Sequence, residues 1–387
     1  MITRVEARNY RCLRSVAAPL RPFQILVGPN GSGKSAFMDV LSFIRDFVSN
    51  TIQYAVRVRT DNFYDLVYGF EDSGFGLAVE ARIPEDRHIA NESGSYTHLR
   101  YDLSVRLDAT SDVPSIESEK MALLGPAHKT VRTIADRSHM HYELAHEDDT
   151  RRSEGNISLF DSVLGSLPAG PKNFPTLKWF ATLLREGVRD VRLRADDLHG
   201  PSTGEAEKAS RLTGANLSRS VSELCEKSPE SFDAWIRHLR TALPDLDTVR
   251  AKPWPQGRAR YLVLRYQNGI EVPSRVVSDG TLCLLALTIL AYMPEANKVY
   301  LIEEPENAVH PTAVDTIYQS LSSLYDSQVL MASHSPVLLG LAKKEQLLCF
   351  ARTAEGTQIV PGNEHPVLQE WKGEVSLSDL FAAGVLG

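Results

Sequence analysis

The hydrophobic pattern changes its period several times along this chain of 387 residues. Residues 2–9 alternate between apolar and polar side chains, which predicts a strand with one buried face. Residues 23–27 form a more continuous apolar run, which is typical of a buried parallel strand. A glycine-rich turn follows, and residues 35–47 repeat apolar side chains at helical spacing. The chain therefore opens with a predicted strand, a turn and a helix that buries one face.

The middle of the chain changes character twice. Strand-like pieces separated by polar linkers run from about residue 66 to 146 and predict an antiparallel sheet. Residues 148–157 are charged, and we interpret them as a loop. Apolar stripes at helical spacing predict that residues 158–243 are mostly helical. Asn268-Gly269 between two alternating runs then predicts a hairpin over residues 261–277.

The last part of the chain alternates between helices and strands, over residues 280–293, 298–302, 311–325 and 328–332. Since a strand, a turn and a helix come first and helix–strand repeats come last, we expect an α/β core built from both ends of the chain. The predicted parts are an N-terminal lobe, a mostly helical insertion or lid, and a C-terminal lobe, over residues 1–150, 151–250 and 251–387.

Composition places the chain among ordinary globular proteins, with 43% hydrophobic and 24% charged residues. It contains no apolar run of the roughly 18 residues that a membrane span needs, so we expect no membrane partner. The four cysteines lie far apart without a CxxC pair, which argues against a zinc site and favours a reducing cytoplasm. The net charge of −7 means that DNA could be bound only by a local basic patch.

The segment from Gly28 to Ser35 fits the phosphate-loop pattern G-x-x-x-x-G-K-[ST] between an apolar strand and an amphipathic helix. Its glycines let backbone N–H groups face phosphate oxygens, and the helix N-terminus adds positive potential. We expect Lys34 to reach the β- and γ-phosphates of ATP, and Ser35 to offer a hydroxyl to Mg²⁺. The predicted nucleotide-binding residues of this loop are Asn30, Gly31, Ser32, Gly33, Lys34 and Ser35.

Two carboxylates, Glu303 and Glu304, end the apolar run that begins at Val299. Such a strand end lies at the carboxyl edge of an α/β sheet, where ligands bind. Adjacent residues of a strand point in opposite directions, so the two acids cannot do the same job. We assign Glu303 to Mg²⁺ and Glu304 to the water that attacks the γ-phosphate. A pair of solvated acids is the alternative.

Ser278 and Gly280 begin an apolar helix, where free N–H groups and the helix dipole form a second anion site. A chain with one phosphate loop does not need that site for its own ATP, so we expect it to approach ATP held by another copy. A plain helix cap by Ser278 or Asp279 is the alternative. His334 ends the next apolar strand and is interpreted as a catalytic partner of the γ-phosphate or the attacking water, against the alternative of a surface histidine.

These segments, in this order, resemble the ABC-type ATPase heads of the SMC/RecF/OLD superfamily, and especially its stand-alone AAA-family ATPases. The matching segments are NYRCLR at 9–14, similar to NF(K/R)SL; EEPENAVHP at 303–311, similar to DEPExxLHP with its Walker B acids and D-loop; ASHSP at 332–336, similar to the switch motif; and 194–202 with 214–217, similar to the lid. The resemblance implies an α/β P-loop NTPase head with an antiparallel β subdomain and a helical lid insertion. It is dense over residues 1–47 and 270–340 and thin over 50–250.

The resemblance also implies an ATP-sandwich dimer, in which Ser278 and Gly280 of one copy meet the nucleotide on Lys34 of the other. Hydrolysis would open and close this clamp and switch a separate effector, a nuclease or toxin, in anti-phage defence, with higher oligomers as an extension. Residues 341–387 are too few for the Toprim nuclease domain of full OLD-type proteins. Glu303 stands where the family has Asp, which predicts slow turnover. Gln53 lies too early in the chain for the family's Q-loop glutamine, so that role is unassigned.

The basic part of the chain leaves open whether it binds DNA, binds a partner protein or is only a solvated surface. Sixteen Lys and Arg against twelve Asp and Glu give residues 172–260 a net charge of +4, whereas the remainder carries −11. Arg185 and Arg189 with their neighbours, and a second basic group from Arg250 to Arg260, suit DNA, a partner protein or a solvated face equally well. DNA binding would fit a RecF-like clamp in repair. A membrane-transporter ATPase is disfavoured by the large insertion and by the D-loop sequence.

The histidines His139, His141 and His146, with Glu143 and Glu147, invite interpretation as a metal site. His139 and His141 would share one face of a strand. Charged residues follow directly in the sequence. We therefore interpret this stretch as a solvated hairpin tip.

Overall fold

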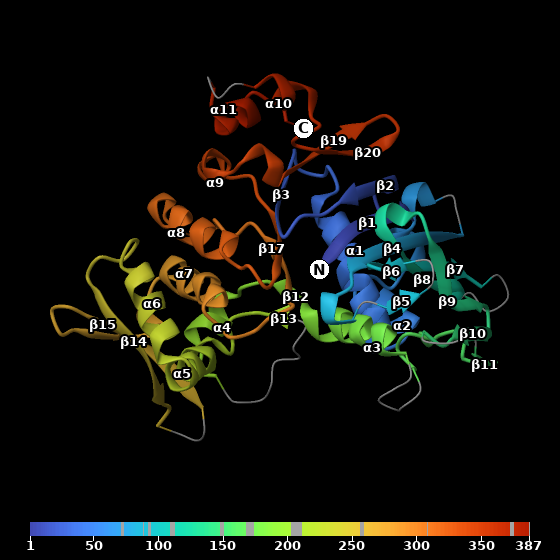
Figure 1. Ribbon diagram of the computed structural model, residues 1–387. Helices are drawn as coiled ribbons and strands as arrows, with labels where there is room; N and C mark the ends of the chain where they lie inside the picture. Colours follow the sequence, from blue (N-terminus) through green and yellow to red (C-terminus); the bar gives the residue numbers. More distant parts are fainter. Residues whose placement is uncertain are drawn as a thin grey trace.

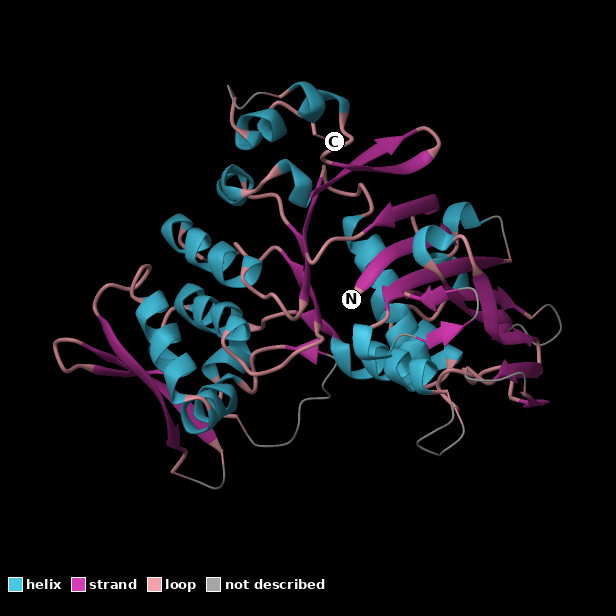
Figure 2. Cartoon of the chain, in the orientation of Figure 1, coloured by secondary structure: helices cyan, strands magenta, loops and turns pink. Residues whose placement is uncertain are grey.

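Two large β-sheets and two small ones organise the part of the chain that the computed structural model describes (Figure 1). The described residues are 1–70, 73–87, 89–91, 94–108, 113–147, 151–167, 174–202, 211–255, 259–307, 309–371 and 375–386. The sheets have eight, seven, three and two strands. Helices accompany them along much of the chain, so the predicted α/β class is confirmed (Figure 2).

The seven-stranded sheet runs through the centre of the molecule (Figure 1). Its strands, in spatial order, are β13 (Arg211–Leu212), β12 (Val188–Val191), β17 (Val299–Glu303), β18 (Gln328–Ala332), β3 (Phe23–Val27), β19 (Leu347–Thr353) and β20 (Gly356–Pro361). Neighbouring strands are parallel except β19 and β20, which are antiparallel. A strand from the start of the chain thus lies between two strands from its last third.

Helices cover both faces of this sheet. Alternate residues point to opposite sides, so Leu26 and Leu330 belong to one buried cluster and Ile25 and Met331 to the other. The first side is covered by α1 (Lys34–Ser49), and the second by α7 (Asp279–Thr288), α8 (Pro311–Ser322) and α9 (Pro336–Leu341) (Figure 1). A sheet covered on both faces needs strands that are apolar on both sides, which explains the continuous apolar runs in the sequence.

The eight-stranded sheet confirms the predicted antiparallel subdomain. Its strands, in spatial order, are β11 (Arg152–Asn156), β10 (His141–Ala145), β9 (Val131–Ser138), β8 (Pro114–Leu124), β7 (His98–Leu107), β4 (Gly74–Arg82), β1 (Ile2–Tyr10) and β2 (Leu13–Pro19). Their alternating apolar residues face α1 and form the same buried cluster as one side of the central sheet.

The lid region combines helices with a small sheet (Figure 2). Its helices are α4 (Ala195–His199), α5 (Leu217–Lys227) and α6 (Pro229–Leu239), and its sheet contains β14 (Leu246–Pro253), β15 (Arg260–Tyr266) and β16 (Glu271–Pro273). The predicted hairpin is confirmed, because β15 pairs antiparallel with β16 and Gly269 takes a positive φ of 84° in the connecting turn. The remaining helices and strands are α2 (Ile52–Arg57), β5 (Ile89–Asn91), β6 (Gly94–Tyr96), α3 (Pro175–Thr182), α10 (Pro366–Glu370) and α11 (Leu377–Ala382).

Several strands were not expected, among them β14, β19 and β20, for whose residues the sequence predicted no strand. Residues 152–156 form β11, so the loop interpretation is wrong there, whereas 148–150 lie outside the described residues. Polar β11 gains its order from backbone pairing with β10. β12 lies inside the range expected to be mostly helical, and β2 lies where no element was predicted. The division of the chain at residues 150 and 250 stays a prediction.

The first strand is fastened to the central sheet by one buried glutamine. Gln328 Oε1 accepts the N–H of Ile2 at 3.0 Å, and its Nε2 donates to Ile2 O at 2.8 Å. This links β1 to β18, which are 326 residues apart. No helix within the described ranges has both the length and the apolar character that a membrane crossing demands.

Candidate active site

The phosphate loop follows β3 and requires glycine at three positions. Gly28, Gly31 and Gly33 have φ values of 146°, 75° and 102°, which L-residues with side chains rarely adopt. A Cβ on Gly28 would also lie 2.2 Å from Phe350 O, and one on Gly33 would lie 2.8 Å from Thr357 Oγ1. The loop is thus pressed against the hairpin of β19 and β20, which leaves no room for side chains there.

Two polar groups of this loop, Lys34 Nζ and Ser32 Oγ, are available to a ligand. The buried Lys34 donates from Nζ to the carbonyls of Gly28 at 2.8 Å and Pro29 at 3.0 Å. Burial lowers the pKa of Lys34, while Glu304 and Glu303 act in the opposite direction. Ser32 Oγ is buried and finds no hydrogen-bond partner in the described part of the chain. A buried hydroxyl without a partner is costly, so this loop fits a polar ligand such as the phosphates of ATP.

The exposed Asn30 and Gly31 form the outer part of the loop. Thr357 Oγ1 donates to Ser32 O at 3.0 Å from the opposite side. Through this contact, β20 holds the loop in place. The two residues are 325 positions apart, so the local sequence pattern could not predict the contact.

The two residues assigned to Mg²⁺ meet. Ser35, at the start of α1, donates from Oγ to Glu303 Oε2 at 3.1 Å. Hydroxyl and carboxylate oxygens are ligands that Mg²⁺ prefers, so the pair fits this ion. Arg192 Nη2 lies 4.0 Å from Glu303 Oε1, and nothing in the sequence pattern connects this arginine with the site.

Glu304 adopts an unusual backbone conformation, with a φ of 47°. Its N–H donates to Ala332 O at 2.8 Å, and Asn307 Nδ2 donates to its Oε2 at 2.5 Å. His334 Nε2 lies 3.9 Å from Glu304 Oε1. The residues assigned to water activation therefore meet at the ends of two neighbouring parallel strands.

The ring of His334 is partly buried and lies near charged side chains of both signs. Burial lowers the pKa of His334, and Lys34 lowers it further, whereas Glu304 and Glu306 raise it. The net direction of this pKa is downward, which favours the neutral imidazole, the form that can accept a hydrogen bond from water. The ring of Phe381 from α11 lies against it, with centroids 6.4 Å apart.

Glu306 is a residue of this site that the sequence did not single out. Its Oε1 accepts hydrogen bonds from Ser333 Oγ at 2.6 Å and from the N–H of His334 at 3.1 Å. The only sequence signal was its place two residues after Glu304 in the D-loop segment. Gln53 lies in α2, away from these groups, beside Arg57 and Tyr64.

The signature residues lie elsewhere. Ser278 caps α7 by accepting the N–H of Thr281 at 3.3 Å, as a plain helix cap does. His199 of α4 holds Asp279, with 2.6 Å between Nε2 and Oδ1. Within the described residues, no hydrogen bond or ion pair joins Ser278 or Gly280 to the phosphate loop, and α7 covers the face of the sheet opposite to α1 (Figure 1).

The histidine-rich stretch of the antiparallel sheet is only partly solvated. Glu143 pairs at the surface with Arg152 at 3.0 Å. Glu147 is buried instead, and its carboxylate accepts the N–H groups of Thr176 and Leu177 at the start of α3. The interpretation as a solvated tip is wrong for Glu147, because this carboxylate satisfies the N-terminus of a helix.

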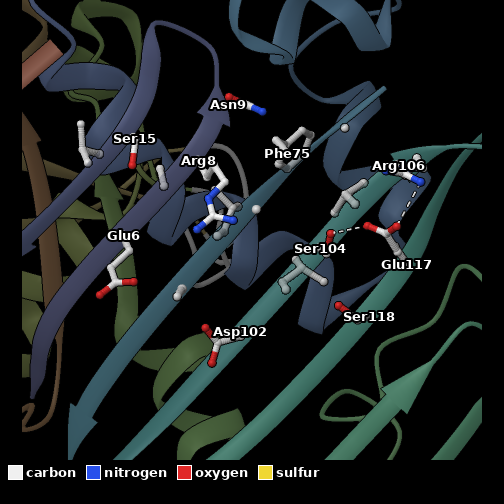
Figure 3. A pocket seen from close by; sticks show the side chains of 18 of the residues that line it. Glu6, Arg8, Asn9, Ser15, Phe75, Asp102, Ser104, Arg106, Glu117 and Ser118 are labelled. Carbon is white, nitrogen blue, oxygen red and sulfur yellow. Dashed lines mark hydrogen bonds and ion pairs between the residues drawn. The ribbon is translucent and has the colours of Figure 1, made fainter. Parts of the chain in front are cut away.

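A hollow on the outer face of the eight-stranded sheet is a second concave feature (Figure 3). It is lined by residues of β1, β2, β4, β7 and β8 and by none of the phosphate loop. Most of its charged side chains are paired with one another: Arg100 binds Glu6 and Asp102 at 2.8 Å each, and Arg106 lies 3.2 Å from Glu117. We therefore place the candidate site at the strand ends of the central sheet.

Residues 23–340 match the family described as "AAA domain, putative AbiEii toxin, Type IV TA system". The match spans most of the chain, from the strand before the phosphate loop to beyond His334. The chain belongs to this family.

Two relatives are similar to this chain over most of its length. The OLD nuclease of Thermus scotoductus is 22% identical over 368 residues, which covers 93% of this chain and 64% of that protein. The retron Vc95 probable ATPase of Vibrio cholerae is 23% identical over 375 residues, which covers 84% of this chain and 68% of that protein. The chain thus spans just under two thirds of the length of the OLD nuclease.

A solved structure agrees with this grouping. The SMC head bound to the C-winged helix domain of ScpA superposes with a TM-score of 0.53 at 15% identity, covering 93% of this chain and 96% of that one. The likeness shows a shared fold and confirms the predicted ABC-type P-loop head. The chain is thus an AAA domain that is similar to OLD, retron and RecF proteins and shares its fold with an SMC head. The roles of single residues stay predictions.

Proposed function

We propose that this chain binds Mg-ATP at its phosphate loop, hydrolyses it between two copies of itself, and thereby switches a separate effector protein in anti-phage defence. The observation that carries the proposal is the convergence of Lys34, Ser35 with Glu303, and Glu304 with His334 at one edge of the central sheet. Ligands of open α/β sheets bind at this edge.

Each side chain has a task in this proposal. Lys34 leaves its loop carbonyls and binds the β- and γ-phosphates, while Ser35 and Glu303 hold Mg²⁺. When bound, Mg²⁺ supplies a Lewis acid that neutralises charge on the phosphate oxygens. Glu304 accepts a proton from the attacking water, and neutral His334 accepts a hydrogen bond that orients it. Glu303 in place of Asp predicts slow turnover.

The separation of the signature from the phosphate loop supports the proposed dimer. Ser278 and Gly280 offer a hydroxyl and backbone N–H groups at the start of α7, yet within the described residues they do not bond to the chain's own loop. A second copy would bring its loop to them, so each site would be completed in trans. Loss of the γ-phosphate would then release the two copies. Higher oligomers would extend this dimer.

The proposed setting rests on the relatives' names, an OLD nuclease and a retron ATPase. A separate nuclease or toxin in the cytoplasm is the effector that this setting suggests. DNA is the alternative partner, as in a RecF-like clamp. Against it, Arg185 donates to the carbonyls of Val48 and Gly165, and Lys252 and Arg260 lie beside Glu271 and Glu226, so these cations already have partners.

The first test compares the wild type with Glu304→Gln by light scattering after size exclusion, with and without Mg-ATP. The amide cannot accept the proton, so the variant should trap an ATP-bound dimer and lose turnover by about 10² to 10⁴-fold. Glu143→Gln, on the exposed edge of the antiparallel sheet, is the matched control. Unchanged mass and unchanged turnover for Glu304→Gln would overturn the assignment of the catalytic acid. DNA affinity that falls steeply with salt would favour the clamp instead.

A further inference from the structure

The loop after β17 folds back onto the end of β18. Asn307 donates its N–H to Glu304 O at 3.0 Å, which closes a turn over residues 304–307. This turn directs the side chain of Glu306 toward the segment that contains His334. Ser333 Oγ and the N–H of His334 both donate to the same oxygen, Glu306 Oε1, at 2.6 and 3.1 Å.

The far end of this contact is rigid. Ser333 is fully buried, its N–H donates to Leu26 O at 3.2 Å, and its Oγ accepts the N–H of Ser335 at 3.0 Å. Ser335 in turn caps α9 by accepting the N–H of Leu338 at 3.3 Å. Whatever fixes Ser333 therefore fixes the backbone on both sides of His334.

The near end is strained. Glu304 has a φ of 47°, a strained conformation for a residue with a side chain, which persists only where the surroundings impose it. One restraint is the hydrogen bond from its N–H to Ala332 O. The contact of Glu306 with Ser333 and His334 is a second restraint between the same two strand ends.

We propose that Glu306 is a positioning residue that sets the distance between Glu304 and His334 by clamping the D-loop to the switch segment. The proposal rests on the proposed hydrolysis of ATP at this site. Glu306 acts as an acceptor through one oxygen, because its Oε2 is buried and has no hydrogen-bond partner among the residues described.

The choice of acceptor gives a sharp test. Glu306→Ala removes the acceptor. Glu306→Gln keeps an acceptor oxygen in the place of Oε1, and its NH₂ group takes the place of Oε2, which has no hydrogen-bond partner among the residues described. We expect Glu306→Ala to lower kcat by about 10² fold, the usual cost of a misplacement near 1 Å. Glu306→Gln should restore kcat to within about threefold of the wild type. The KM for ATP and the affinity for a fluorescent ATP analogue should change less than about twofold in both, because Glu306 does not touch the phosphate loop.

Ser333→Ala supplies a second route if Glu306→Ala does not fold. It removes one of the two donors to Glu306 and should lower kcat in the same direction, and combining it with Glu306→Gln should add little further loss. Equal kcat for Glu306→Ala and the wild type would overturn the inference. A loss of kcat in Glu306→Gln as large as that in Glu306→Ala would also overturn it, because the effect would then come from the lost charge. Absence of turnover in the wild type would instead refute the proposed function itself.

Discussion

Several polar side chains of α1 are buried, and this predicts a large effect of one substitution. Arg45 is 1% exposed and lies 2.8 Å from Asp46 and 3.0 Å from Asp190 of β12. Asp190 also accepts a hydrogen bond from Ser42 Oγ at 2.7 Å. The linked ionised side chains are Arg11, Arg45, Arg59, Asp39, Asp46 and Asp190. Their charges cancel, so removal of one carboxylate leaves a buried excess positive charge.

We predict that Asp190→Ala lowers the free energy of unfolding by about 3 kcal/mol. Breaking a buried ion pair costs roughly 3–5 kcal/mol, and the lower end applies because Arg45 keeps Asp46. The orphaned hydroxyl of Ser42 contributes about 1 kcal/mol of that loss. Asp190→Asn should cost about half as much, since its amide oxygen can still accept one bond.

The assay is urea-induced unfolding followed by circular dichroism and tryptophan fluorescence, with m values compared among variants. Glu143→Ala, which breaks the exposed pair with Arg152, is the control and should stay within about 0.5 kcal/mol of the wild type. The double variant Arg45→Met with Asp190→Leu should lose clearly less than the sum of the two single changes. A loss below about 1 kcal/mol for Asp190→Ala, or strict additivity of Arg45→Met and Asp190→Leu, would refute the reasoning.

Two further predictions concern the loop and the antiparallel sheet. Gly28→Ala places a Cβ 2.2 Å from Phe350 O at a φ of 146°, which strains the loop by about 1–3 kcal/mol. We therefore expect lower thermal stability and an ATP affinity that calorimetry finds at least about tenfold weaker. Unchanged ATP affinity would contradict this. The hydrogen bond from Arg100 lowers the pKa of Glu6 to about 2 in the folded protein. Since the unfolded value is about 4.3, ionised Glu6 stabilises the fold above that pH, and this contribution is lost as pH falls toward 2. Arg100→Gln should flatten the pH dependence of the urea midpoint in that window, and an unaltered slope would exclude the pair as its cause.

The strands that hold the site could be predicted from the sequence almost to the residue. β3, β17 and β18 are buried on both faces, so their apolar runs stand out from the polar segments around them. The meeting of Ser35 with Glu303 follows from the same fact, because the ends of parallel strands share one edge of the sheet. Motif spacing and strand geometry together therefore suffice for this half of the candidate site.

The contacts that complete the site could not be predicted, since they join residues far apart in sequence. β12 has the sequence Val-Arg-Asp-Val, and its two central charged residues do not indicate a buried strand. Asp190 is tolerated there only because Arg45 lies against it, 145 residues earlier in the chain. Glu306 is likewise surface-like in sequence, and its partners come from another strand end. A polar residue buried by a distant partner leaves no trace in local periodicity.

The pairing of His199 with Asp279 bears on how an effector would be switched. Both nitrogens of His199 are engaged, one with Asp279 at 2.6 Å and the other with Ser274 O at 2.9 Å, so α4 of the lid is fastened to the start of α7. Ser278 lies at that same helix start. In a sandwich dimer, the γ-phosphate of one copy would pull on Ser278 of the other, and α4 would have to follow α7. ATP binding and release would therefore move a partner bound to the lid directly. A partner bound to the antiparallel sheet would be moved only through the central sheet. For this reason we expect the effector to dock on the lid side of the molecule.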